Sequence, residues 1–296
     1  MDLDQFKRLL IRVSAFIRRN RAHVILWAGV VILFFPVFKQ VYCGKWSSLD
    51  YDHAYFILPV SVFLAWRLRG ELSGIYGRRK AGLSWGCVSV FAVSVWMYVF
   101  GWKWGYMFVC MAAFIPAAAA LTGLIYGLGV LKRLWFSFFY LVFMIPPPAP
   151  MLDSITLPMR YVSSSIAYKM LAVAGYNVVK KGLLINIQDF SIMVGNACSG
   201  FRSFITLTAL GLLYIYFYAN KERLLYKGIL LGLIPVLAIV GNSLRICVIG
   251  LLGYHFGAEI ADGFLHSFSG VIVFVFMIMG LFLADSIMAK MWKKRR

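Results

Sequence analysis

A cysteine, an arginine and a histidine, far apart in the chain, have the residue types of a nucleophilic hydrolase or transferase. Cys198 lies in the segment GNACSGFR at residues 195–202, where we expect an apolar helix to begin. The positive end of a helix dipole and its free amides favour a thiolate, and Arg202 adds positive charge. The segment therefore predicts a nucleophilic cysteine, with a small packing cysteine as the alternative.

Arg245 ends the segment GNSLR at residues 241–245, inside another apolar run. An arginine within a membrane span is costly and marks a pair or a site, unless its side chain reaches back to the interface. Asn242 adds a polar group one helical turn away on the same face. We therefore treat Arg245 as a candidate catalytic residue and Asn242 as a supporting one.

His266 opens the last apolar run and supplies the third group. Histidine is the usual general acid or base near neutral pH, although an interfacial histidine also serves as a polar anchor. Asp262 lies four residues earlier and would orient the imidazole if the helix extends that far. His255, in the preceding loop, is a rival for the same role.

The elements that must position these residues are membrane helices. The hydrophobic fraction is 62% and the mean hydropathy is +0.81. Several runs reach the roughly 20 residues that cross a bilayer. We predict an all-α integral membrane fold of about eight spanning helices, near residues 23–38, 54–66, 82–101, 105–130, 134–150, 199–219, 228–250 and 266–288.

The positive charge indicates the orientation of these spans. The net charge is +19, and with a cytoplasmic N-terminus 21 of the 30 Lys and Arg fall on the inner side. The positive-inside rule then places both termini in the cytoplasm of a cell-membrane protein, so the charge calls for no nucleic-acid partner. Cys198, Arg245 and His266 all reach the outer face. We expect a basic N-terminus (1–22), one membrane domain (23–289) and a basic tail (290–296).

One outer segment differs from a simple span. The prolines of residues 146–150 must end the fifth span, because proline has no amide donor. Apolar residues recur at helical spacing from Ile155 to Val173, with Arg160 and Ser164 opposite, which predicts an interfacial helix. Alternation over residues 183–194 then predicts a short β-hairpin that leads into Cys198.

The five cysteines are scattered over apolar runs, an odd number that argues against a disulfide framework. The sequence has no CxxC motif or Cys/His cluster, so we expect no metal and no cofactor.

The motifs resemble those of the exosortase/archaeosortase family. The blocks ACSG (197–200), NSLR (242–245) and HSFSG (266–270) are similar to its Cys, Arg and His motifs, in the same order. The segment HAYFILP (53–59) resembles an early family motif that usually has glycine at Ala54. The resemblance covers residues 50–290. Asn196 departs from the acidic residue of many members, which leaves the subfamily and substrate open.

The resemblance implies a membrane cysteine protease or transpeptidase. Its partners would be membrane lipids and secreted proteins with a C-terminal sorting signal, made of a motif, a spanning helix and a basic tail. Cys198 would be the nucleophile, Arg245 would stabilise the thiolate or oxyanion, and His266 would protonate the leaving amine. Three alternatives remain: an anion transporter, an intramembrane serine protease using Ser199, and a scaffold for envelope polysaccharide assembly.

Overall fold

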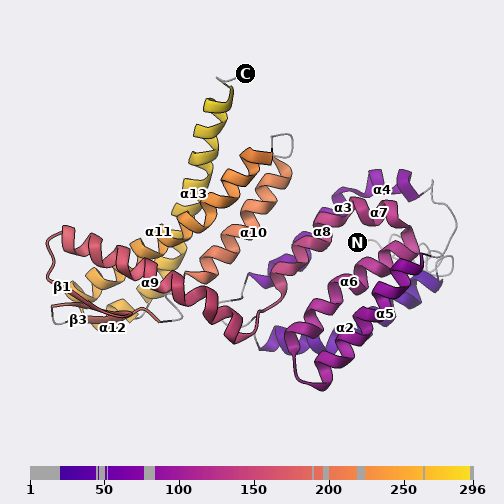
Figure 1. Cartoon of the computed structure of the whole chain (residues 1–296), viewed down its shortest axis with the longest axis horizontal. Helices are drawn as coiled ribbons and strands as arrows, with labels where there is room; N and C mark the ends of the chain where they lie inside the picture. Colours follow the sequence, from indigo (N-terminus) through magenta and orange to yellow (C-terminus); the bar gives the residue numbers. More distant parts are fainter. Residues whose placement is uncertain are drawn as a thin grey trace, which may run out of the picture. The chain divides into compact units, whose positions relative to one another are not determined.

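The computed structural model is a helical protein that divides into two compact units between Pro146 and Pro147 (Figure 1). It describes residues 21–44, 46, 51, 53–76, 84–188, 190–195, 200–218, 224–262 and 264–293. Within these ranges, the side chains of residues 76, 262, 264–270, 292 and 293 are left out of the description. Each unit is treated below by itself, and the expectation of one packed membrane domain stays a prediction.

The first unit is entirely helical in its described part. Its elements are α2 (Arg21–Cys43), α3 (Ala54–Arg67), α4 (Arg69–Tyr76), α5 (Trp85–Lys103), α6 (Met107–Tyr126), α7 (Leu128–Arg133), α8 (Trp135–Tyr140) and the 3₁₀ helix η1 (Leu141–Met144). Helices α5 and α6 pack along each other through small residues. A Cβ on Gly101 would lie 2.8 Å from Cys110 Sγ, and one on Gly123 would lie 2.7 Å from Cys87 Sγ. Such close contacts are how membrane helices associate, so both cysteines have packing roles.

An ion pair joins the short helices α4 and α7 of this unit, which we expect on the same side of the membrane. Arg133 Nε donates to Glu71 Oε2 at 2.7 Å. The hydrogen bond from Arg133 holds the pKa of Glu71 below its ordinary value. Since α5 and α6 lie between the two residues in sequence, two crossings would return the chain to the face it left. The contact agrees with the alternation that the charge pattern predicts.

The second unit holds the rest of the chain. Its elements are α9 (Ala149–Val173), β1 (Val178–Lys181), β2 (Leu184–Ile187), β3 (Phe190–Met193), α10 (Phe201–Phe217), α11 (Leu224–Phe256), α12 (Ala258–Asp262) and α13 (Phe264–Lys293). Helix α11 runs through two hydrophobic cores. Its first half packs with α10 and α13 around Leu207, Leu230 and Met277. Its second half packs with α9 and the sheet around Leu171, Ile187 and Ile246.

The predicted hairpin exists and has a third strand. The antiparallel sheet has the order β1-β2-β3, with Ile187 opposite Phe190 and Lys181 opposite Leu184. The alternation of residues 185–194 places Ile185, Ile187, Ile192 and Val194 on the buried face. Strand β1 is added by a second tight turn, in which Gly182 has φ +62°.

Helix α9 is present as predicted, but its polar side is not solvated. Thr156, Ser163 and Ser164 are buried, whereas Val162 and Val173 are exposed. The α9 helix packs its polar stripe against α11 and presents its apolar side outward, which suits contact with lipid. The interfacial position of α9 stays a prediction.

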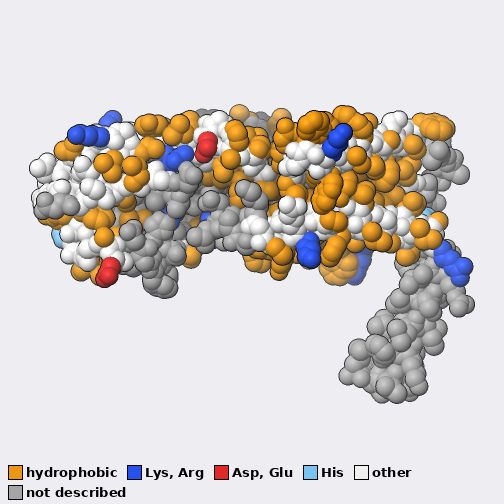
Figure 2. Space-filling model, turned by 90° about the horizontal axis from the view of Figure 1, so that it is seen from below, with side chains coloured by type: hydrophobic (Ala, Val, Ile, Leu, Met, Phe, Trp, Pro, Cys, Tyr) orange, Lys and Arg blue, Asp and Glu red, His pale blue; other side chains and the backbone are white. Residues whose placement is uncertain are grey.

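The apolar surface confirms a membrane fold, although the number of spans is not confirmed. Among the described residues five helices are long and apolar enough to cross a bilayer, or six if the helices on either side of residues 145–148 form one bent span. Helices α3 and α10, where we also predicted spans, have 14 and 17 residues. Hydrophobic side chains cover much of the face in Figure 2, with few charges among them.

A carboxylate ties the far ends of three helices in the second unit. Asp285 of α13 accepts hydrogen bonds from Tyr214 of α10 (2.7 Å) and Tyr226 of α11 (2.6 Å). In the predicted orientation this cluster lies toward the inner side, opposite the candidate site. It fixes the three helices that carry or adjoin Cys198, Arg245 and His266.

Substituting Tyr226→Phe should lower the free energy of unfolding by about 1–3 kcal/mol, because a buried hydrogen bond to a charged acceptor is lost. Thermal unfolding of the purified protein in detergent measures this. Tyr218→Phe is the matched control, since Tyr218 is 77% exposed. An equal loss of stability in both variants would contradict the role of the cluster.

Candidate active site

The segment that carries the candidate nucleophile connects the sheet to α10. Cys198, with its neighbours Asn196 and Ser199, lies outside the described residues. On one side the description ends at Gly195, just after β3, and on the other it resumes at Gly200, the N-cap of α10. Arg202 is exposed in the first turn of α10. Cys198 therefore precedes the first helical residue by three positions, near the helix start that the sequence predicted.

Gly200 places this segment against α11. Its φ is +71°, in the left-handed region that favours glycine. A Cβ at Gly200 would lie 2.9 Å from both Cβ and Cγ of Asn242. Asn242 is buried and lies three residues before Arg245 on the same helix. The backbone two residues after Cys198 thus touches α11 within one turn of the candidate arginine.

Arg245 lies where the two cores of the unit meet along α11. The core with α10 and α13 includes α11 as far as Ala238, and the core with α9 and the sheet begins at Ile246. Between them stand Gly241, Asn242, Ser243 and Arg245, a polar and small stretch within an apolar helix. Arg245 is half-buried. A charge in this position is held away from open solvent, which strengthens its interaction with a nearby anion.

Helix α13 approaches the same stretch of α11. A Cβ at Gly241 would lie 2.7 Å from Met277 Sδ and 3.0 Å from Val273 Cγ1. At about 1.5 Å per residue, Arg245 lies about 6 Å from this contact along α11. His266 lies about 10 Å before Val273 along α13. Both displacements run toward the end of the unit where α10 begins. The meeting of Cys198, Arg245 and His266 at this end stays a prediction, because Cys198 lies outside the described residues.

The expected support from Asp262 to His266 loses its helical basis. Asp262 is the last residue of α12, and α13 begins separately at Phe264. The two positions are therefore not four residues apart on one continuous helix. The side chains of both residues lie outside the description, so their pairing stays a prediction.

The other histidines have different surroundings. His255 is exposed at the end of α11, and its Nε2 lies 3.2 Å from the hydroxyl of Tyr176. His53 is buried in the first unit. Among the described residues no three His, Cys, Asp or Glu side chains form a group that could hold a metal.

A second arginine with little exposed surface lies on α9, on the side that the sequence places opposite the apolar residues. The side chain of Arg160 is 11% exposed, with Nη2 3.3 Å from Thr156 Oγ1 and 3.9 Å from Asp153 Oδ1. Only the packing of α9 against α11 reveals its burial. The spacing of Thr156, Arg160 and Ser163 puts them on one face of the helix, and this is the sequence feature that could have predicted the burial of Arg160.

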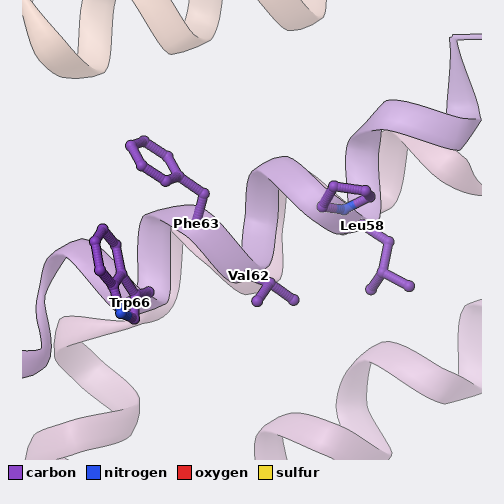
Figure 3. Close-up of a pocket in the computed structure, with 5 residues that line it drawn as sticks. Leu58, Val62, Phe63 and Trp66 are labelled. Atoms are coloured by element: carbon purple, nitrogen blue, oxygen red, sulfur yellow. The ribbon is translucent and has the colours of Figure 1, made fainter. Parts of the chain in front are cut away.

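An apolar depression on the surface contains none of these candidate residues. Leu58, Pro59, Val62, Phe63 and Trp66 line it, and the labelled side chains project along α3 in Figure 3. It belongs to the first unit and offers no catalytic group. Its exposed aromatic and branched side chains suit contact with lipid tails.

These features define a multi-pass membrane protein in which one of the two units carries a small three-stranded sheet. A comparison with family profiles matches residues 46–283 to the transmembrane exosortases. The chain belongs to this family, which supports a membrane transpeptidase of the exosortase kind. No curated protein and no solved structure gives a significant match.

The contact at Gly200 gives a direct test of the packing. Gly200→Ala should lower the free energy of unfolding by about 2–5 kcal/mol, from left-handed strain and from overlap with Asn242. Thermal unfolding in detergent measures the effect. Gly195→Ala is the control, because a Cβ there meets nothing within 4 Å. If Gly200→Ala unfolds at the wild-type temperature, Gly200 and Asn242 are not in contact.

Proposed function

We propose that the protein is a membrane cysteine transpeptidase or protease that removes C-terminal sorting signals from secreted proteins at the outer face of the cell membrane. The observation that carries the proposal is the contact of Gly200 with Asn242, which supports the approach of Cys198 to Arg245. Family membership supports the reaction class. Both termini would lie in the cytoplasm.

In this mechanism the thiolate of Cys198 attacks the scissile carbonyl carbon, and its oxygen becomes an oxyanion. Arg245 stabilises first the thiolate and then the oxyanion. As the C–N bond breaks, His266 gives a proton to the leaving amine, and a thioester to Cys198 remains. An acceptor amine or water attacks the thioester and releases the product and the thiol.

The substrate's own membrane helix would position the scissile bond. A spanning helix with a basic tail adopts the same orientation as this protein's helices, with the tail inside. Its processing motif then lies at the outer face, where the predicted topology places residues 195–202. The helix confines the motif to the membrane plane, which reduces the entropy that binding would otherwise cost.

The nucleophile is tested with a reporter, a secreted domain fused to a C-terminal motif, helix and basic tail from the same genome. Cys198→Ala should abolish removal of the signal while the protein still accumulates. Alanine at Cys43, Cys87, Cys110 or Cys247 should preserve processing, because the structure places these thiols at the surface or in helix packing. Gel mobility and the mass of the new C-terminus report the outcome.

The same experiment separates the alternatives. If Ser199→Ala stops processing and Cys198→Ala does not, the nucleophile is the serine. If no reporter of this kind is processed by the wild-type protein, the proposed function is wrong, and anion transport becomes the better explanation of the buried arginines.

Arg245 should act through both its charge and its shape. Arg245→Lys should lose most activity, because a planar guanidinium with five donors binds an anion in a way that ammonium cannot replace. An opposite charge within ~4–6 Å lowers the pKa of an acid by ~1–3. The pH midpoint of Cys198 alkylation should therefore rise in Arg245→Ala, and alkylation at neutral pH should slow.

Alkylation is measured in a protein whose other four cysteines are alanine. His266→Ala is the comparison, since loss of a general acid should block turnover and leave alkylation near normal. Unchanged alkylation profiles in Arg245→Lys and Arg245→Ala would exclude Arg245 as the thiolate's partner. Full processing by Arg245→Ala would remove it from the mechanism.

A further inference from the structure

In the described part of the chain, the strand that precedes the nucleophile segment pairs with another strand on one side only. Strand β3 pairs with β2 on one side, and its last residue, Met193, is five residues before Cys198. Since a chain spans at most about 3.6 Å per residue, Cys198 lies within about 18 Å of Met193. A ligand bound along β3 would therefore reach the candidate nucleophile within a few residues.

The register shows which amides point to the open side. Val194 N–H donates to Leu183 C=O at 3.0 Å, so these two form a hydrogen-bonded pair. In an antiparallel ladder such pairs alternate with non-bonded ones, so the next are 185 with 192 and 187 with 190. Ser191 and Met193 thus direct their N–H groups away from β2. Among the described residues no backbone acceptor outside the strands binds either amide.

The two edges of the sheet differ in chemistry. Strand β1 carries Lys180 and Lys181, and Lys180 Nζ lies 5.7 Å from the ring centre of Tyr161 on α9. Lysines on an edge strand discourage the addition of another strand. Strand β3 has the sequence FSIM, without charge or proline, and Ser191 and Met193 are exposed. Only the edge next to the nucleophile segment lacks this protection.

We propose that the edge of β3 binds the substrate's processing motif as an added β-strand, next to the scissile bond. The inference rests on the proposed function and names the surface that recognises its substrate. Backbone hydrogen bonds to Ser191 and Met193 hold the motif extended, while its alternate side chains supply specificity. The inner face of the sheet is fixed to α11 by buried residues, which makes β3 a rigid template.

The first test removes one edge amide. Proline is tolerated on an edge strand where its nitrogen faces outward, so Met193→Pro should fold and lose one donor. The test uses a reporter that the wild type processes. Loss of a hydrogen bond with a net free energy of about 0.5–1.5 kcal/mol should raise KM about 2- to 13-fold and leave kcat nearly unchanged.

A variant on the opposite edge controls for other effects. Lys180→Pro makes the same change on β1, away from the proposed binding edge, and should keep KM within about 2-fold of wild type. An equal KM for Met193→Pro and wild type, with the reporter processed by both, would overturn strand addition and leave the proposed function intact.

A second test does not depend on turnover. In Cys198→Ala protein without its other cysteines, Ser191→Cys is joined by mild oxidation to single cysteines scanned along the reporter's motif. Disulfides form only when the Cα atoms are about 4.4–6.8 Å apart. Moving the enzyme cysteine from position 191 to Met193→Cys should shift the preferred reporter position by two residues. No disulfide at any position, or a shift of another size, would refute the added strand even if Met193→Pro fails to accumulate.

Discussion

The close contact of Gly200 with Asn242 is the constraint on which the second unit depends. It brings the start of α10 against the middle of α11, at a distance that leaves no room for a Cβ. The same glycine has a left-handed backbone, so the chain turns sharply from the nucleophile segment into the helix. A side chain at this point would push the start of α10 away from Asn242. The close packing and the left-handed turn therefore both require glycine at position 200.

Helix α11 supports this contact because apolar packing holds it on both sides. Its two halves belong to two cores, one with α10 and α13 and one with α9 and the sheet. The polar stretch of residues 241–245 lies between them. The apolar packing offsets the free energy that burying an arginine and an asparagine costs. The hydrogen bonds of Tyr214 and Tyr226 to Asp285 then fix the opposite ends of the three helices.

A rigid helical frame also explains the place of the sheet. In the proposed function an extended substrate segment is held beside Cys198, and helices offer no unpaired backbone donors along their sides. The edge of a strand does offer them. In this protein a three-stranded sheet is packed on α11, and its last strand continues into the nucleophile segment. The arrangement joins a template for backbone pairing to the cysteine within a few residues of chain.

The sequence by itself determined the helices, the hairpin and the order of the candidate residues. Long apolar runs become helices in lipid because every backbone group must be bonded internally, and strict alternation at Ile185, Ile187 and Ile192 required a half-buried strand. These are local properties of the chain. The sequence did not predict β1, because Lys180 and Lys181 show no strand pattern and form a strand only where β2 offers partners.

Tertiary structure decided which faces are buried and which residues meet. The sequence places polar residues on one side of α9, and the structure shows that Thr156, Ser163 and Ser164 on this helix are buried. Asp262 and His266 belong to the separate elements α12 and α13, although their spacing suggested one helix. The contact of Gly200 with Asn242 joins positions 42 residues apart in the chain. Such contacts depend on how whole helices pack, and no local pattern of residues encodes the distance between two helices.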